Sequence, residues 1–209
     1  MKKLFSALIL TLLIPLTSYA QDYSDGNGYT TIANPVRTDD PSKVEVREVF
    51  WFGCPHCYHL EPYTQAWKKT IANNDKVDFN YMPAVFGRNW LAHAKAFYVA
   101  DLLGIEDKVH DDIYTAIHVK RERLNTEDSL AAFFANYGVS EDEFHKQFNS
   151  FAVESRLNQA DARIRAYGVR GTPTIVVNGK YLVDASTAGG NENIFNVVNY
   201  LIKKEEQNK

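Results

Sequence analysis

The chain is poor in cysteine, with only Cys54 and Cys57 among its 209 residues. Two cysteines are too few for a fold held together by disulfides, and a chain of this length can bury a core without them. A structural disulfide between such close neighbours would also close too small a loop to stabilise much. We therefore expect the pair to serve chemistry rather than support.

The chain lacks the residues that a zinc site or a covalent haem attachment site would need beside Cys54 and Cys57. A zinc site built on Cys-x-x-Cys needs two more ligands, but there is no second cysteine pair, and His56 and His59 do not have zinc-finger spacing. Haem attachment needs a histidine directly after the second cysteine, where this chain has Tyr58. We expect no metal, and a redox role for the dithiol is the interpretation that remains.

Basic residues are also few, with 23 Lys and Arg against 26 Asp and Glu, and they form no run. The formal net charge of −3 argues against nucleic acid as a partner. After the first 20 residues, no apolar stretch approaches the roughly 20 residues that a membrane-spanning helix needs.

The first 20 residues have the pattern of a secretory signal peptide. Lys2 and Lys3 precede an apolar stretch from Leu4 to Leu16, and Ser18-Tyr19-Ala20 supplies a small-x-small cleavage site. An uncleaved N-terminal anchor is the alternative, which the short apolar stretch and the cleavage site disfavour. We therefore expect residues 1–20 to be removed and the rest to enter an oxidising compartment, where disulfides persist.

The two cysteines lie where a strand pattern changes into a helical one. Val44 to Phe52 is predicted as a strand with two faces that become apolar toward its end, as in a central strand covered on both sides. Glu48 is the misfit, because its face is otherwise apolar. The helical pattern begins at Cys54 and runs to about Ala72, and Pro55 suits its first turn, where a missing N–H costs nothing.

The other elements complete an α/β pattern. Strands are predicted at Tyr29–Ile32, where an edge strand fits, and at Val77–Val85. Residues 89–167 show a series of helical patterns and no convincing strand. Strand patterns at 174–177 and 180–183 then flank Asn178-Gly179, a strong hairpin signal, and a last helix precedes a charged end, 203–209, that is expected to fray.

This order is the thioredoxin arrangement with extra helices between its halves. We assign residues 21–87 and 152–209 to a thioredoxin-like domain and residues 88–151 to an inserted α-helical subdomain. His93, His110, His118 and His145 are scattered over the helical patterns, and we expect them to be exposed or to cap helices.

The position of the dithiol gives each sulfur a role. Cys54 is expected at a helix N-terminus, where free N–H groups and the helix dipole lower its pKa and make it the nucleophile. Cys57, one turn further, is the natural resolving thiol, and His56 between them can further favour the Cys54 thiolate. Each pKa unit of depression raises the potential of the couple by roughly 30 mV, so a stabilised thiolate makes the disulfide a better oxidant.

Gly171-Thr172-Pro173-Thr174 directly precedes the predicted hairpin. A proline is allowed at a strand start in either isomer, and the thioredoxin arrangement favours a cis Thr172–Pro173 bond. That geometry would put Thr172 beside Cys54, with its backbone free to pair with a bound peptide.

The sequence resembles the DsbA family of periplasmic thiol:disulfide interchange proteins in three features. They are the motif Cys54-Pro55-His56-Cys57-Tyr58, the helical insertion and the stretch Val177-Asn178-Gly179-Lys180-Tyr181. The resemblance covers essentially the whole mature chain. It implies catalytic roles for Cys54, Cys57, His56 and Pro55, and identifies Glu48 as the family's buried acid that aids proton transfer. It places substrate binding at Thr172 and Pro173.

The resemblance also implies a reaction and its partners. A periplasmic, monomeric oxidase would donate the Cys54–Cys57 disulfide to unfolded secreted polypeptides through a mixed disulfide at Cys54. A quinone-linked membrane partner of the DsbB type would reoxidise it, and no soluble cofactor would be needed.

The sequence departs from the family's best-known members at two positions. Thr172 replaces a nonpolar residue before the cis proline, and its hydroxyl can hydrogen-bond to the Cys54 sulfur. The lysine that partners the buried acid is missing, and Tyr81 falls there. Two rival functions stay open: a reductase or isomerase built on the same motif, and a chaperone-like binding module that uses apolar surface around Trp51.

Overall fold

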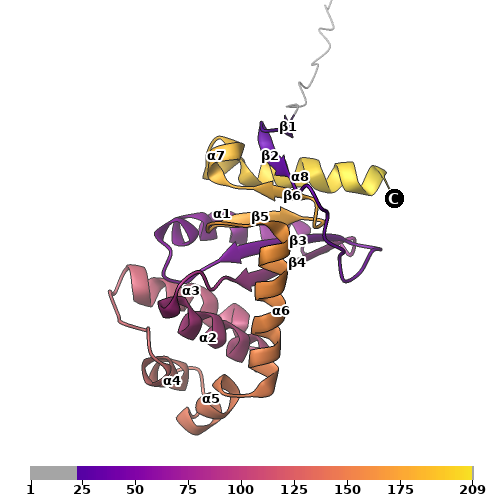
Figure 1. The fold of residues 1–209 in the computed structure, drawn as a ribbon. Coiled ribbons are helices and arrows are strands. Elements are labelled where there is room, and N and C mark those ends of the chain that lie inside the picture. The colour runs from indigo at the N-terminus through magenta and orange to yellow at the C-terminus, as the bar shows by residue number, and fades with distance from the viewer. Residues whose placement is uncertain (1–22, 209) are drawn as a thin grey trace, which may run out of the picture.

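The computed structural model describes residues 23–208, so the predicted signal peptide lies outside the described residues (Figure 1). These residues form a six-stranded sheet with the strand order β1-β2-β6-β5-β3-β4. The strands are β1 (Ser24–Asp25), β2 (Gly28–Thr31), β3 (Val44–Phe50), β4 (Val77–Pro83), β5 (Thr174–Val177) and β6 (Tyr181–Val183).

Strand β3 is the buried centre of the sheet, as its two apolar faces predict. It pairs in parallel with β4 and antiparallel with β5, and all seven of its residues are buried. It ends at Phe50, two residues before the predicted end, because the chain turns there and the Cys54 N–H donates to the Trp51 carbonyl.

The predicted β5–β6 hairpin is confirmed. The two strands pair antiparallel, and both loop residues have positive φ, 52° at Asn178 and 63° at Gly179. Positive φ at both positions is what a two-residue turn of this hand requires, and Asn-Gly supplies it at low cost.

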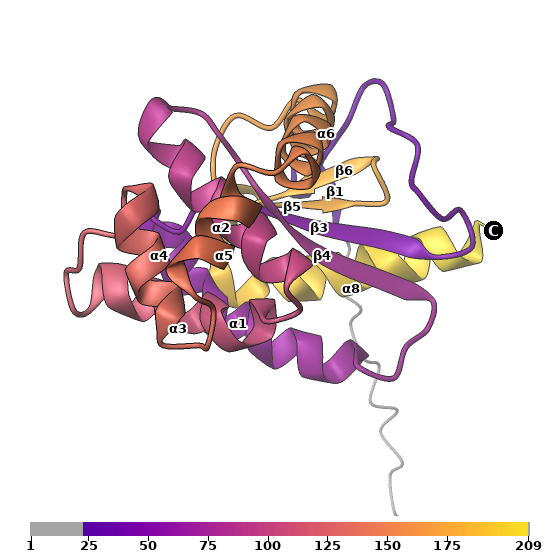
Figure 2. The same cartoon turned by 90° about the horizontal axis from the view of Figure 1, so that it is seen from below.

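Helices cover both faces of the sheet (Figure 2). α1 (Pro55–Ile71) and α8 (Asn191–Gln207) lie against one face, and α6 (Phe151–Tyr167) lies against the other. The apolar residues divide accordingly, since Val46 and Val177 share a cluster with Leu60 and Leu201, whereas Val49 belongs to the cluster that contains residues of α6.

The helices between β4 and α6 gather at one end of the molecule (Figures 1 and 2). They are η1 (Arg88–Trp90), α2 (Leu91–Leu102), α3 (Glu106–His118), α4 (Glu127–Ala135) and α5 (Glu141–Phe148). Side chains of Thr126, Ser140 and Ser150 cap α4, α5 and α6 by accepting backbone N–H bonds. The thioredoxin fold with a helical insertion is therefore confirmed, while the proposed boundaries at 87/88 and 151/152 stay predictions.

Two expectations need correction. The charged C-terminus is helical to Gln207, because Glu205 is only 3% exposed and accepts hydrogen bonds from Lys180, Asn178 and Tyr181. A short helix, α7 (Ala185–Ala188), was not predicted; the Asp184 carboxylate caps it by accepting two backbone N–H bonds. None of the helices between residues 23 and 208 is long and apolar enough to cross a membrane.

Candidate active site

Cys54 is the N-cap residue of α1, and Pro55 follows at its start. Cys57 lies one turn further and is completely buried, and both thiols are free. The turn before them requires glycine at position 53, because a Cβ there would lie 2.3 Å from the indole of Trp51. That indole cannot easily move aside, since it stacks on Trp90 with ring centroids 4.2 Å apart.

The two thiols have opposite acidities. A hydrogen bond from the Cys57 thiol is the largest cause that lowers the pKa of Cys54, to about 5. The side chain of Thr172 and the backbone N–H groups of Cys57 and His56 add to this effect, against the opposing effect of burial. Burial raises the pKa of Cys57 far above its ordinary value. Cys54 is therefore the thiolate at neutral pH and Cys57 the protonated thiol.

His56 acts on Cys54 through its backbone. Its N–H donates to the sulfur at the helix N-terminus, whereas its side chain is exposed. The expected contribution of its imidazole stays a prediction.

The Thr172–Pro173 peptide bond is cis, as predicted, and lies beside the dithiol. The Cys54 Sγ is 3.4 Å from the Thr172 carbonyl oxygen, to which the protonated thiol donates. Thr172 and Pro173 are half-buried and line a groove of about 380 Å³, which leaves them accessible to a partner.

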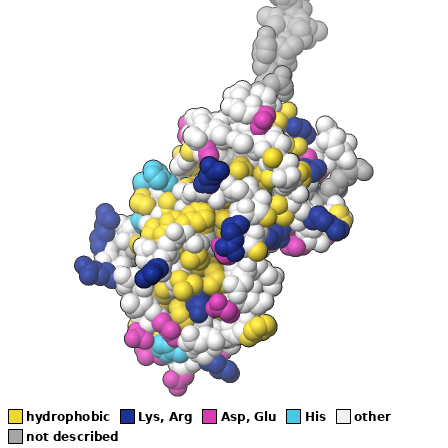
Figure 3. Space-filling model, viewed as in Figure 1, with side chains coloured by type: hydrophobic (Ala, Val, Ile, Leu, Met, Phe, Trp, Pro, Cys, Tyr) yellow, Lys and Arg dark blue, Asp and Glu magenta, His cyan; other side chains and the backbone are white. Residues whose placement is uncertain are grey.

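Apolar side chains surround the same end of α1. Phe86 and Leu91 are 44% and 40% exposed, and the Phe86 ring lies 5.4 Å from that of Trp90. Figure 3 shows apolar side chains gathered beside α6, over the junction of the sheet and the helical insertion. An exposed apolar area beside a reactive sulfur can hold unfolded polypeptide.

Glu48 is fully buried on β3, under α1. One carboxylate oxygen accepts a bond of 2.8 Å from the Thr64 hydroxyl, and the other has no hydrogen bond. Its strand neighbour on β4 is Tyr81, as the sequence indicates. Burial, and then the charge of Glu61, raise the pKa of Glu48 to about 8. Glu48 is therefore protonated at neutral pH.

The sequence reasoning missed the partners of Glu48. Glu61 is 5% exposed and accepts hydrogen bonds from Tyr81 (2.7 Å) and Gln65 (2.8 Å). Its spacing of four residues from Cys57 on one helix could have pointed to it.

The predicted exposure of His93 and His110 is wrong, because they are 5% and 1% exposed. His93 contacts the Leu124 carbonyl at 2.7 Å, and His110 lies between two glutamates.

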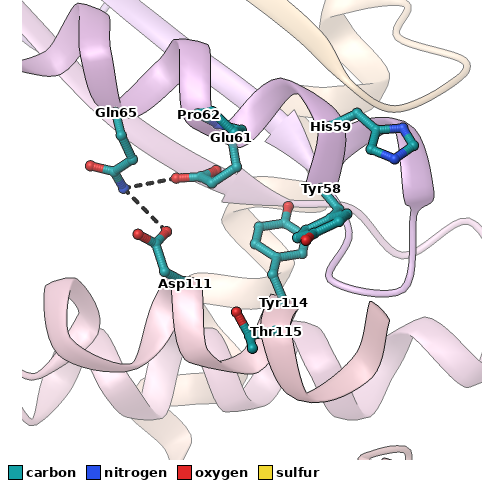
Figure 4. A pocket seen from close by; sticks show the side chains of 8 residues that line it. All are labelled: Tyr58, His59, Glu61, Pro62, Gln65, Asp111, Tyr114 and Thr115. Atoms are coloured by element: carbon teal, nitrogen blue, oxygen red, sulfur yellow. Dashed lines mark hydrogen bonds between the residues drawn. The ribbon is translucent and has the colours of Figure 1, made fainter. Parts of the chain in front are cut away.

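A cleft of about 460 Å³ opens between α1 and α3 beside this cluster (Figure 4). Its lining comprises Tyr58, His59, Glu61, Pro62, Gln65, Asp111, Tyr114 and Thr115. The Gln65 amide spans the cleft, since it donates to Glu61 and lies 3.5 Å from Asp111. Within residues 23–208, no three His, Cys, Asp or Glu side chains are grouped to hold a metal ion.

A thioredoxin fold with an acidic Cys54 at a helix N-terminus, a buried Cys57 and an adjacent cis proline defines a thiol:disulfide oxidoreductase. Residues 65–201 match the family model of the DSBA-like thioredoxin domain. The chain is 38% identical over 202 residues to the thiol:disulfide interchange protein DsbA of Pseudomonas aeruginosa, covering 97% of this chain and 95% of that protein. It is 39% identical over 212 residues to DsbA of Azotobacter vinelandii, covering 98% of each.

The crystal structure of Pseudomonas aeruginosa DsbA superposes with a TM-score of 0.84 at 39% identity, covering 90% of this chain and 97% of that one. This chain therefore belongs to the DsbA-like thioredoxin family.

Proposed function

We propose that this protein is a dithiol oxidase that donates its Cys54–Cys57 disulfide to newly secreted, unfolded polypeptides. The observation that carries the proposal is the pKa of Cys54, lowered to about 5 beside a Cys57 thiol that stays protonated. A stabilised thiolate favours the reduced enzyme, so the oxidised enzyme readily passes its disulfide on.

The cycle has two exchanges. A substrate thiolate attacks Cys54 Sγ, the Cys54–Cys57 bond breaks, and Cys57 leaves and takes a proton. A second substrate thiolate then attacks the substrate sulfur of this mixed disulfide, and Cys54 leaves as the thiolate that its surroundings stabilise. The substrate has lost two electrons and two thiol protons, and the enzyme is reduced.

The polypeptide is bound, in this proposal, by the backbone at Thr172 and Pro173, which lines the groove, and by the apolar side chains around Trp90. Reoxidation passes the two electrons to a quinone-linked membrane partner of the DsbB type. The enzyme works as a periplasmic monomer without metal or soluble cofactor. The names of the DsbA relatives and the N-terminal export pattern support this placement.

The test is oxidative folding of a reduced, unfolded protein by stoichiometric oxidised enzyme. The wild type is expected to form disulfides in the substrate, and Cys54→Ser to form none. His145→Gln is the matched control, since His145 lies on α5 and pairs with Glu127. Full activity of Cys54→Ser would refute the proposal.

A further inference from the structure

His110 occupies an unusual place for a histidine. It lies on α3 of the helical insertion, is 1% exposed, and stacks on Tyr81 with ring centroids 4.1 Å apart. The rings of Phe50 and Phe52, just before the dithiol, lie 5.2 Å and 5.0 Å from it. An aromatic enclosure of this kind disfavours a polar ring unless both of its nitrogens find partners.

Both nitrogens lie within ion-pair distance of carboxylates, although neither makes a hydrogen bond. Nδ1 lies 3.0 Å from Glu106 Oε1, and Nε2 lies 3.5 Å from Glu61 Oε2. A neutral imidazole has one N–H and one lone pair, so it would turn its lone pair toward one of these anions. The positive charge of the imidazolium is attracted to both carboxylates at these distances, and His110 is therefore the buried cation of this cluster.

The cation has more acidic neighbours than it can balance. Glu61 also accepts hydrogen bonds from Tyr81 and Gln65, which favour its charged form. Glu106 is partly exposed, so water stabilises its charge. Glu48 is fully buried and has one hydrogen bond, from Thr64. The distribution of charge with the lowest free energy therefore has Glu61 and Glu106 ionised and Glu48 protonated.

We propose that His110 is a positioning residue for the dithiol chemistry, because its buried imidazolium holds Glu61 in the charged form and so directs the shared proton of the cluster to Glu48. This inference rests on the proposed function, and it names His110 as the residue that keeps Glu61 ionised, so that Glu48 carries the proton for the disulfide exchange. The pKa values agree with this distribution. Burial lowers the pKa of His110, but the two glutamates outweigh it and raise the value to about 9, and the pKa of Glu61 is lowered although burial opposes this.

The proton has a use at Cys57, about two helical turns before Thr64 on α1. Thr64, which binds Glu48, lies seven residues after Cys57 and so on the same face of α1. When the Cys54–Cys57 bond breaks, Cys57 leaves as a buried thiolate, and the Glu48 proton moves to its sulfur while Glu48 becomes the carboxylate. The cleft between α1 and α3, with Glu61, Gln65 and Asp111 along it, gives the cluster its access to solvent (Figure 4).

Titratable and charged groups surround His110 on four elements. They are Glu61 and Lys68 of α1, Glu48 of β3, Tyr81 of β4, and Glu106, Asp111 and Tyr114 of α3. From α2 His110 meets the Phe97 ring.

The charge of His110 can be measured in the wild-type protein. Its ring ¹⁵N and ¹³C chemical shifts should be those of an imidazolium at about pH 8, where an ordinary histidine with a pKa near 6.5 is neutral. A neutral His110 at that pH would overturn the inference without any substitution. His145 supplies a reference signal, because it also pairs with a glutamate but is partly exposed.

The placement of the proton is tested by the infrared C=O stretch of a protonated carboxyl group at neutral pH. In the wild-type background this band should disappear in Glu48→Gln and persist in Glu61→Gln. In the His110→Gln background a second band should appear that Glu61→Gln removes, because Glu61 loses its cation and takes up a proton. Glu48 should stay protonated there, since the His110 charge is one of the causes that lower its pKa. His110→Lys should remove the added band, and His145→Gln should leave the wild-type bands unchanged.

A His110→Gln protein without an added band that Glu61→Gln removes would overturn the inference. A wild-type protein that oxidises substrates but has no band removed by Glu48→Gln would also overturn it, and would leave the proposed function intact. Loss of oxidase activity from the wild type would instead refute the proposed function. Should His110→Gln not fold, the wild-type NMR measurement and the Glu48→Gln band decide.

Discussion

The Sγ atom of Cys54 lies 3.4 Å from the backbone carbonyl oxygen of Thr172, 118 residues later in the chain. The Thr172 side chain is also one of the causes that lower the pKa of Cys54. The loop before β5 therefore both flanks the reactive sulfur and helps to set its charge.

Thr172→Val should raise the pKa of Cys54, because the hydroxyl that donates to the thiolate is lost while the backbone stays. The Cys54 pKa should remain below its ordinary value of 9.0, since the Cys57 thiol and the helix N–H groups still donate. Ultraviolet absorbance of the thiolate against pH measures this. Thr70→Val, whose hydroxyl bonds within α1 to Trp67, is the control. An unchanged midpoint would remove Thr172 from the account.

Cys57→Ala should raise the pKa of Cys54 by more than Thr172→Val does. The Cys57 thiol is the largest cause of the depression, ahead of Thr172 and the backbone N–H groups. The same absorbance titration compares the two variants. A larger shift in Thr172→Val would mean that the loop, not the dithiol, controls the nucleophile.

Glu48→Gln should change how stability depends on pH. The folded-state pKa of Glu48 is raised from 4.5 to about 8, so between these values the folded protein holds a proton that the unfolded chain releases. The wild type therefore loses stability as pH rises through this window, by at most about 1.4 kcal/mol per pH unit from this group. The variant lacks this loss.

The measurement is urea unfolding of both proteins from about pH 5 to pH 8, compared as a difference so that shared groups such as Cys54 largely cancel. The difference should grow in favour of Glu48→Gln as pH rises. A pH-independent difference would show that Glu48 is already ionised in the folded protein.

An ion-pair network far from the dithiol should govern stability without affecting redox chemistry. Glu45 is 2% exposed and bonds to Arg47 at 2.9 Å and to Arg163 of α6 at 2.5 Å. Glu45→Ala should lower the free energy of unfolding by about 1–3 kcal/mol, because both arginines lose a buried partner while Arg47 keeps Asp78 and Arg163 keeps Asp39. Asp101→Ala removes an exposed pair with Arg156 and should cost under about 1 kcal/mol.

Both variants should keep the redox potential of the wild type, which equilibration with glutathione measures. A Glu45→Ala protein of unchanged stability would show that this buried network contributes little. A changed potential would link it to the active site, which the structure gives no reason to expect.

Local chemistry made much of the site predictable. Asn178-Gly179 indicates its own turn, and Pro55 after Cys54 indicates a helix start, because each depends on backbone properties of a few neighbouring residues. Even the Glu48–Tyr81 pairing followed from strand register and resemblance.

The missed features depend on contacts between distant segments. The helical pattern of α3 cannot say that His110 meets Glu61, because that contact depends on how α3 packs against α1. The charged end of the chain likewise predicts fraying, but Glu205 is buried and bonds to the hairpin residues Asn178, Lys180 and Tyr181.

The most direct test of the account is the equilibrium of the purified mature protein with a graded series of reduced and oxidised glutathione. A low Cys54 pKa predicts a couple more oxidising than the glutathione pool, so that the enzyme gives its disulfide away. A potential near about −270 mV, in the range of a reducing thioredoxin, would contradict the oxidase and favour a reductase.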